Sequence, residues 1–236
     1  MIAFTARRPT NFPTSMWSWH YVAGVDVVPA AVTTGTVVAF GDSITDGYNS
    51  TTDANRRRPD HLAARLRSES GGQRLSVTDA GIGGNMVLRA AGWEPQGTAG
   101  VDRFAHDALG QPGVRDVIFM KGVNDINNTP SLTADQLIGG YKNIIAQAHA
   151  ADVRIIGGTM LPYSAHSSAQ AGVRMTVNSW IRTSGAFDAV VDFDAVIRDP
   201  SNHARMLPAF DAGDHLHPND AGMEAMANAV DLSTLR

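Results

Sequence analysis

The chain has no cysteine, and this absence removes several classes of protein from consideration. A disulfide scaffold, a cysteine-ligated zinc site, an iron–sulfur cluster and a thiol nucleophile all require cysteine. The absence of cysteine does not determine the redox compartment of the protein, because secreted proteins can also lack cysteine. Any chemistry in this chain must therefore come from other side chains.

Long apolar runs are also missing. No run approaches the roughly 18 residues that a membrane-spanning helix requires. The N-terminal stretch MIAFTARRPTNFPTS has its arginines after a short apolar start, whereas a secretory signal has its basic residues first. We expect a soluble protein without a signal peptide, which is cytoplasmic unless a leader or an upstream domain precedes this chain and directs export.

An excess of positive charge is absent too. The 19 lysines and arginines are outnumbered by 23 aspartates and glutamates, and the only lysines are Lys121 and Lys142. With a net charge of −4, the chain lacks the excess of basic residues that binding to nucleic acid or to an anionic membrane surface would favour. Nucleic-acid binding is therefore not expected.

The chain does contain enough residues for one sizeable domain with an appendage, because it has 236 residues, of which 43% are hydrophobic. Residues 1–35 are predicted to be an N-terminal extension. Within it MWSWHYVAGVDVV (Met16–Val28) is typical of a strand or two, and PAAVTTGT of a linker. Two of the four tryptophans lie there, so we expect the extension to pack on the domain of residues 36–236 or on a second copy of it, which would form a homo-oligomer.

After residue 35, short apolar runs alternate with longer amphipathic stretches. The expected strands are Val37–Phe40, Ser76–Ala80, Asp116–Met120, Arg154–Gly157 and Ala189–Phe193. The expected helices are Asp60–Ser68, Val101–Ala108, Thr133–Ala150, Ala169–Thr183 and about Asp220–Val230, the last capped by Asn219. Continuous apolar strands are typical of a parallel sheet that is buried on both faces. The alternation predicts an α/β fold, a three-layer sandwich built from right-handed crossovers.

Ligands of an open parallel sheet bind beyond the carboxyl ends of its strands, so the residues that follow each strand are the candidates for chemistry. Polar and small residues of catalytic types follow the first three strands and recur near the C-terminus. These segments are GDS (Gly41–Ser43), DAGIGGN (Asp79–Asn85), KGVNDIN (Lys121–Asn127) and DAGDHLHPND (Asp211–Asp220). Each alone is explained by a helix cap or a turn. Four such coincidences at one edge of the sheet favour a shared site.

Ester hydrolysis accounts for this set of residues. A serine nucleophile needs a base within hydrogen-bond reach and a carboxylate that orients the base. Ser43 has no histidine near it in sequence, so its base must be brought to it by folding. Asp214 and His217 lie three residues apart, a spacing that brings both side chains to the same side of a turn, whereas His215 is predicted to point away. The oxyanion donors would be the N–H of Ser43, a glycine N–H in GIGGN and the amide of Asn124.

The four segments, in this order, resemble the four sequence blocks of the SGNH hydrolases, also called GDSL esterases/lipases, from about Thr36 to the C-terminus. The resemblance implies a flavodoxin-like sandwich with the strand order 2-1-3-4-5 and a serine esterase that acts on short acyl or acetyl esters of small molecules or carbohydrates. It implies Ser43 as the nucleophile, His217 as the base and Asp214 as the partner of the base. The oxyanion hole would consist of the N–H groups of Ser43 and Gly84 and the side chain of Asn124. No metal and no cofactor are implied.

The second block departs most from the family pattern. Asp79 stands where many relatives have asparagine. Two glycines, Gly83 and Gly84, are adjacent, so the sequence leaves open which of them supplies the oxyanion N–H. The residues that select the acyl group cannot be identified by a motif. Met86, Trp93, Met160 and Tyr163 are candidates to line the pocket, and core packing explains each of them equally well.

Three other functions were weighed against the esterase. A metal-dependent hydrolase would use Asp214, His215 and His217, but no further histidine cluster follows another strand. A nucleotide-binding module is disfavoured, because Met86 stands where the last glycine of Gly-x-Gly-x-x-Gly belongs. A non-catalytic scaffold would have no need of this complete set of residues.

Overall fold

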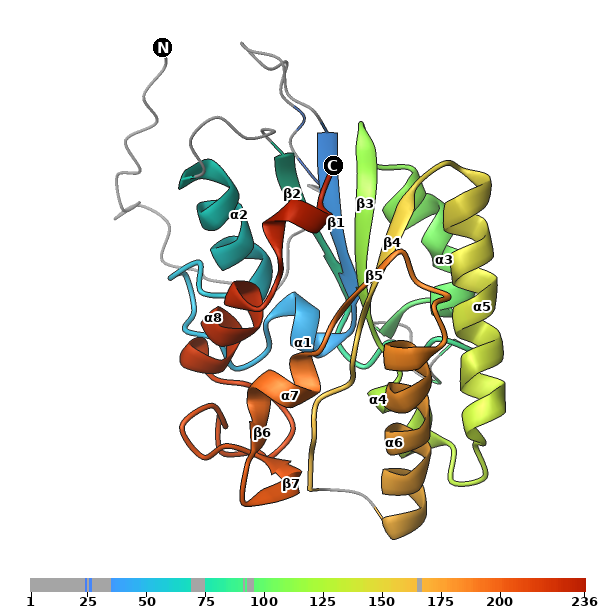
Figure 1. Ribbon diagram of the computed structural model, residues 1–236, viewed down its shortest axis with the longest axis vertical. Coiled ribbons are helices and arrows are strands. Elements are labelled where there is room, and N and C mark those ends of the chain that lie inside the picture. The colour runs from blue at the N-terminus through green and yellow to red at the C-terminus, as the bar shows by residue number, and fades with distance from the viewer. Residues whose placement is uncertain are drawn as a thin grey trace. The chain divides into compact units, whose positions relative to one another are not determined.

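A parallel sheet of five strands forms the middle layer of the structure, a computed structural model of the chain (Figure 1). Its strands are β1 (Gly35–Gly41), β2 (Leu75–Gly81), β3 (Val114–Met120), β4 (Arg154–Gly158) and β5 (Ala189–Val191). They lie in the order β2-β1-β3-β4-β5, and each neighbouring pair is parallel. The predicted α/β class is confirmed, and so is the strand order that the resemblance implies.

The structure describes residues 24, 26, 35–68, 75–90, 92, 96–164 and 167–236. The predicted extension of residues 1–35, with its strand-like segment and its linker, therefore falls almost wholly outside the described residues, and so does Trp93. Among the helices that are described, none has both the length and the apolar character that crossing a bilayer requires.

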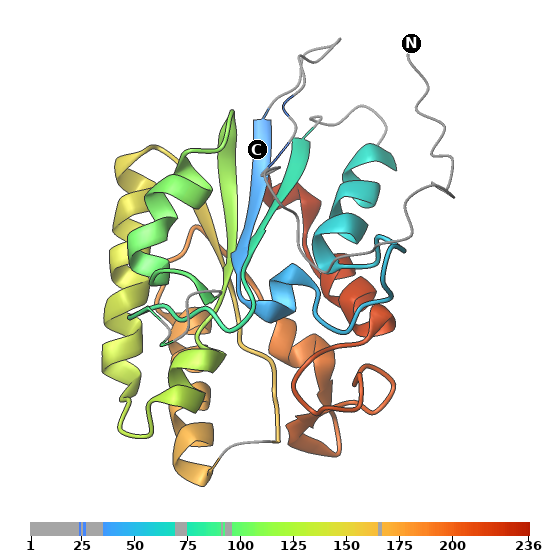
Figure 2. The same cartoon turned by 180° about the vertical axis from the view of Figure 1, so that it is seen from behind.

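Helices cover the two faces of the sheet, as Figures 1 and 2 show from opposite sides. On one face α2 (Arg58–Ser68) packs against α8 (Asp220–Asn228). On the other face α5 (Ala134–Ala150) packs between α3 (Gly100–Phe104) and α6 (Ser168–Thr183). A π-helical turn, Ala105–Leu109, continues α3. These helices agree with the five that the sequence predicts.

The central strand β1 shows why the strands are apolar without alternation. Val37, Val38, Ala39 and Phe40 are all fully buried. Val38 and Phe40 belong to the core under α3, α5 and α6, whereas Val37 belongs to the core on the opposite face. Because helices cover both faces, side chains that point either way must be apolar.

Local capping chemistry sets the starts of the long helices. Thr133 and Ser167 form capping boxes with Gln136 and Gln170 at the starts of α5 and α6. The side chain of Asn219 accepts a hydrogen bond from the N–H of Gly222 and caps α8, as predicted.

Several short elements at the strand ends were not predicted. They are α1 (Ser43–Asp46), α4 (Val123–Asn128), α7 (Phe193–Ile197), a 3-10 turn (Leu232–Thr234) and the hairpin of β6 (Arg198–Asp199) and β7 (Asn202–Met206). The prediction of strand as far as Phe193 is wrong at its end. The carboxylate of Asp192 accepts a hydrogen bond from the N–H of Ala195, which caps α7 and ends the extended backbone.

Candidate active site

Ser43 is the first residue of α1, directly beyond the carboxyl end of β1. Asp42, not Ser43, caps this helix, because its carboxylate accepts a hydrogen bond of 3.1 Å from the N–H of Ile44. Gly41 is small by necessity: a Cβ there would lie 2.0 Å from Oγ1 of Thr45. The serine hydroxyl is therefore not used as a cap and remains available for chemistry.

The fold brings Ser43, His217 and Asp214 into one chain of hydrogen bonds. Oγ of Ser43 lies 2.8 Å from Nε2 of His217, and Nδ1 of the same ring lies 2.6 Å from Oδ2 of Asp214. The other carboxylate oxygen accepts the backbone N–H groups of Leu216 and His217, at 3.0 and 2.8 Å. This arrangement lets the imidazole accept a proton from the hydroxyl while the carboxylate holds the ring in place.

The carboxyl of Asp214 stays ionised at neutral pH. Partial burial raises its pKa, but the hydrogen bonds from the backbone and side chain of His217 and from the N–H of Leu216 outweigh that effect. The net pKa lies below the usual aspartate value. A charged acceptor therefore faces Nδ1 of His217.

The loop that carries Asp214 and His217 is closed at its base. Asp211 and Pro218 form an antiparallel bridge, and the N–H of Ala212 donates to the carbonyl of His217 at 3.1 Å. The N–H of Asn219 donates to the carbonyl of Phe210 at 2.8 Å. The closed loop leads directly into α8, so the position of His217 is tied to the helix layer.

The candidate oxyanion donors lie on the neighbouring strand ends. Gly83 and Gly84 occupy the middle of a turn that the N–H of Asn85 closes on the carbonyl of Ile82 at 3.1 Å. Gly84 has φ +72, which favours glycine, and a Cβ there would meet the side chain of Gln96 at 2.5 Å. Nothing lies within 4 Å of a Cβ on Gly83. Of the two, only Gly84 has a backbone conformation that favours glycine.

Asn124 lies on α4, just after β3. Its Nδ2 donates to the backbone carbonyl of Asn85 at 3.1 Å. An amide nitrogen carries two hydrogens, so this bond leaves one donor of Asn124 for a ligand. The segments after β2 and β3 are thus joined at the residues that the sequence analysis singles out.

Two residues of the site were not found from the sequence. Nδ2 of Asn49 donates to Oδ2 of Asp214 at 2.9 Å. The ring of Tyr48, which is 57% exposed, lies with its centroid 4.6 Å from that of His217. Both residues lie shortly after Ser43 in sequence, but nothing in GYNS indicates that this segment folds back onto the loop that carries Asp214.

A comparison with known protein families assigns residues 39–225 to the GDSL-like lipase/acylhydrolase family. The chain belongs to this family. It is therefore a carboxylic ester hydrolase of the GDSL, or SGNH, type. No curated protein matches the chain.

Solved structures show the same fold as this GDSL hydrolase at low sequence identity. The M. smegmatis aryl esterase is 16% identical with a TM-score of 0.65, and the match covers 83% of this chain and 95% of that one. Est24, a carbohydrate acetylesterase from Sinorhizobium meliloti, is 13% identical with a TM-score of 0.65 and the same coverages of 83% and 95%. A GDSL-like lipase from Bacteroides thetaiotaomicron is 18% identical with a TM-score of 0.59, covering 85% and 88%.

His215 of the GDSL hydrolase does not join the Ser43 site. Its Nδ1 lies 2.6 Å from Oδ2 of Asp211, and its side chain is 66% exposed. His215 and His217 thus contact different carboxylates, which is not the shared ligand set that the metal alternative required. Among the described residues, no group of three or more histidines and carboxylates is arranged to hold a metal ion.

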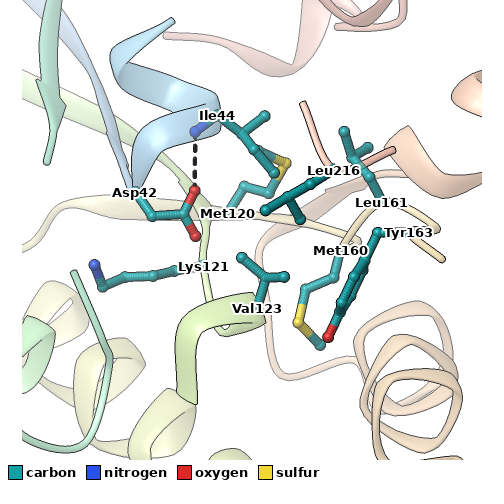
Figure 3. Close-up of a pocket in the computed structure, with 9 residues that line it drawn as sticks. All are labelled: Asp42, Ile44, Met120, Lys121, Val123, Met160, Leu161, Tyr163 and Leu216. Atoms are coloured by element: carbon teal, nitrogen blue, oxygen red, sulfur yellow. Dashed lines mark hydrogen bonds between the residues drawn. The ribbon is translucent and has the colours of Figure 1, made fainter. Parts of the chain in front are cut away.

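A small pocket of the GDSL hydrolase is lined in part by Asp42 and Ile44, the two sequence neighbours of Ser43 (Figure 3). It is lined by Asp42, Ile44, Met120, Lys121, Val123, Met160, Leu161, Tyr163 and Leu216. Two of the predicted pocket residues, Met160 and Tyr163, are in this lining. Of the other two candidates, Met86 is buried and does not line the pocket, and Trp93 lies outside the described residues.

Proposed function

We propose that this GDSL hydrolase cleaves short-chain carboxylic esters by a serine mechanism, with Ser43 as nucleophile, His217 as base and Asp214 as its partner. The observation that carries the proposal is the unbroken set of contacts from Oγ of Ser43 through both ring nitrogens of His217 to Asp214. Each member comes from a segment beyond the carboxyl end of the sheet, where an α/β fold binds its ligands.

In the first half-reaction, Nε2 of His217 takes the proton of the Ser43 hydroxyl as Oγ attacks the ester carbonyl. The tetrahedral intermediate collapses when the same nitrogen returns that proton to the departing alkoxide, which leaves as the alcohol. In the second half-reaction a water attacks the acyl-serine, and its proton passes to His217 and then back to Oγ. Asp214 remains a carboxylate throughout and stabilises the imidazolium.

We propose that the oxyanion is held by the N–H groups of Ser43 and Gly84 and by Nδ2 of Asn124. The fixed positions of the glycine turn and of the Asn124 side chain support this assignment. Donors that are already in place need no reorganisation as the negative charge develops, and each contributes about 3 kcal/mol to catalysis.

The pocket supports a short acyl group. Three of its lining residues neighbour the proposed catalytic residues in sequence: Ile44 follows Ser43, Leu216 precedes His217, and Val123 precedes Asn124. Its far walls are the buried side chains of Met120, Met160, Leu161 and Tyr163, each no more than 3% exposed. The free space between these side chains is small, so we propose that the pocket selects against long acyl chains, which would have to displace the core. Acetyl esters of carbohydrates or of phenols are the substrates that we propose.

A panel of p-nitrophenyl esters of rising chain length, run beside acetylated xylan, tests the proposal. We expect the highest kcat/KM for acetyl to butyryl esters and no loss of activity in EDTA. The Ser43→Ala variant is expected to lose on the order of 10⁴- to 10⁶-fold in kcat, as other serine hydrolases do when the nucleophile is removed. Activity lost in EDTA and restored by zinc would contradict the serine mechanism. A Ser43→Ala variant that keeps a tenth of the activity would place the nucleophile elsewhere.

A further inference from the structure

A cluster of buried polar side chains lies behind the proposed oxyanion donors, and the serine mechanism does not use it. Its members are Asn85, Arg103 and Lys121, which are only 0%, 5% and 1% exposed. We call these three residues the Asn85 cluster. Two cations in the interior are costly to bury, and apolar side chains would fill the same space at lower cost. Their presence therefore calls for a physical reason.

Asn85 is the centre of this cluster, and every polar group of the residue has a partner. Its Oδ1 accepts hydrogen bonds from Nε of Arg103, at 2.9 Å, and from Nζ of Lys121. Its Nδ2 donates to the carbonyls of Gln96 and Thr98, at 2.5 and 2.7 Å. The side chain is thus held on both sides and cannot rotate without breaking several bonds.

The backbone of Asn85 holds two of the three proposed oxyanion donors. Its N–H closes the turn that contains Gly84, and its carbonyl accepts the bond from Nδ2 of Asn124. A shift of Asn85 would therefore move the Gly84 N–H and the Asn124 amide together. The side chain of Asn85 fixes this backbone, and Arg103 and Lys121 fix the side chain.

The two cations also reach the segment that carries the nucleophile. Arg103 donates through Nη2 to the carbonyls of Gly41 and Ala80, at 2.9 and 3.0 Å, and Lys121 donates to the carbonyl of Gly41 at 3.3 Å. Gly41 lies two residues before Ser43 and ends β1, Ala80 lies in β2, and Lys121 directly follows β3. The Asn85 cluster therefore connects the ends of the three strands that carry all three proposed oxyanion donors.

The surroundings are built to accept these cations. The guanidinium carbon of Arg103 lies 4.0 Å from the centroid of the Phe40 ring, and Nη1 of Arg103 donates to Oδ2 of Asp107 at 2.9 Å. Gly100 leaves room for Lys121, because a Cβ at that position would lie 2.9 Å from the lysine Cε. Burial lowers the pKa of Lys121 to about 7, against the opposing attraction of Asp42. The lowered pKa reflects the cost of removing the ammonium group from water.

We propose that Arg103 and Lys121 are positioning residues, which act through Asn85 to set the spacing of the oxyanion donors on Ser43, Gly84 and Asn124. This inference rests on the proposed function. It goes beyond it by assigning a role to two buried basic residues that the serine mechanism does not use. The physical basis is that an oxyanion hole works only when its donors are within a few tenths of an ångström of the developing charge.

Lys121→Met is the sharpest test, because methionine keeps the length of the side chain and removes its donors and charge. We expect kcat for p-nitrophenyl acetate to fall about 10- to 100-fold while KM changes less than about threefold, since the donors act in the transition state. The matched control is Lys142→Met, the same substitution at the other lysine, which is exposed on α5. It is expected to match the wild type.

A double-mutant cycle with Asn124→Ala separates positioning from a general loss of stability. If Lys121 acts through Asn85 on both Asn124 and Gly84, the loss of kcat in the double variant is smaller than the product of the two single losses, because the part of the Lys121 effect that passes through Asn124 is already gone. Losses of kcat that simply multiply, or a Lys121→Met variant with wild-type kcat, would overturn the proposal.

If Lys121→Met does not fold, Arg103→Lys serves in the same cycle. Lysine retains the charge but cannot reach Asn85, Gly41, Ala80 and Asp107 at once. The same fall in kcat and the same lack of additivity are expected, and unchanged kcat would overturn the inference. Ser43→Ala is measured alongside. A Ser43→Ala variant that remains active contradicts the proposed function. If Ser43→Ala is inactive while the Lys121 and Arg103 variants keep the wild-type kcat, only the positioning role is contradicted.

Discussion

Two histidine–aspartate pairs lie on the same loop, and they have nearly the same local geometry. His217 and His215 each place Nδ1 2.6 Å from Oδ2 of an aspartate, Asp214 and Asp211 respectively. In each pair the other carboxylate oxygen accepts the backbone N–H of the same histidine, at 2.8 and 3.1 Å. A search for aspartate beside histidine would therefore find both pairs equally.

The pairs differ in what surrounds the imidazole. The side chain of His217 is 9% exposed and its Nε2 contacts Ser43, whereas the side chain of His215 is 66% exposed. Burial of the carboxylate does not separate them, because Asp214 is the more exposed of the two aspartates. The comparison teaches that a carboxylate orients a histidine equally well in either place, and that the hydroxyl partner and the exclusion of water distinguish the candidate base.

Replacement of each histidine by alanine gives the largest expected contrast. We expect His217→Ala to lose on the order of 10⁴- to 10⁶-fold in kcat/KM, because no other group accepts the Ser43 proton. His215→Ala is expected to stay within about threefold of the wild type. The measurement is kcat/KM of both variants on p-nitrophenyl acetate at neutral pH. An inactive His215→Ala beside an active His217→Ala would reverse the assignment of the two pairs.

Replacement of each aspartate by asparagine is expected to separate activity from stability. Asp214→Asn should lower kcat by roughly 10²- to 10⁴-fold, because the amide no longer stabilises the imidazolium, while Asp211→Asn leaves kcat nearly unchanged. Equal losses of kcat in the two variants would show that the pairs are not functionally distinct.

Both aspartates should contribute to stability in the same range of pH. Burial raises the pKa of each carboxyl, but hydrogen bonds from the paired histidine and the nearby backbone outweigh it, so both pKa values lie below the usual 3.8. The contribution is therefore complete above about pH 4 and is lost as the pH falls through the lowered pKa values. Urea unfolding of each Asn variant at pH 7 and pH 3 checks this, and a difference from the wild type that grows on acidification would contradict it.

Asn49 makes the third difference between the pairs, because it donates to Asp214. We expect Asn49→Ala to lower kcat about three- to tenfold, since Asp214 keeps its two backbone donors and its bond to His217. Asn143→Ala, at an exposed position of α5, is the matched control. A loss of kcat as large as that of Asp214→Asn would make Asn49 a principal support of the base.

The smallest expected effect concerns the backbone of His215, which has φ +61. His215→Gly removes the bond to Asp211 but relieves this left-handed conformation, so the free energy of unfolding should change by less than about 1 kcal/mol. His215→Ala keeps the strain and is expected to be less stable than His215→Gly by about 1 kcal/mol. Urea denaturation of both variants decides the order, and equal stabilities would mean that the backbone at this position is not strained.

The sequence predicted the main elements of the fold because their patterns are long and continuous. The run from Val37 to Phe40 is apolar at every position, which indicates a strand covered on both faces. The helices α1, α4 and α7 were missed, because four to six residues are too few to show a helical period. They form where a strand end and a cap such as Asp42 or Asp192 turn the chain.

The residues of the candidate site also fall into two groups, those that the sequence predicted and those that it did not. Ser43, Asn124, Asp214 and His217 were found from the order and spacing of four segments, and their roles remain proposals to be tested by the variants above. Tyr48 and Asn49 were not found, because their contacts join residues that are more than 160 positions apart in the chain. A hydrogen bond between such distant residues leaves no local pattern.

The sequence by itself determined the family, the α/β class and the residues that are available for chemistry, because each of these is written in local periodicity or in a short motif. The sequence also favoured His217 over His215 as the base, but the contact between His217 and Ser43, which are 174 positions apart, exists only in the tertiary structure. The tertiary structure also decided that Lys121 is buried beside Asn85. Burial and partnership depend on how separate strands and helices pack, and residues far apart in the chain jointly determine that packing.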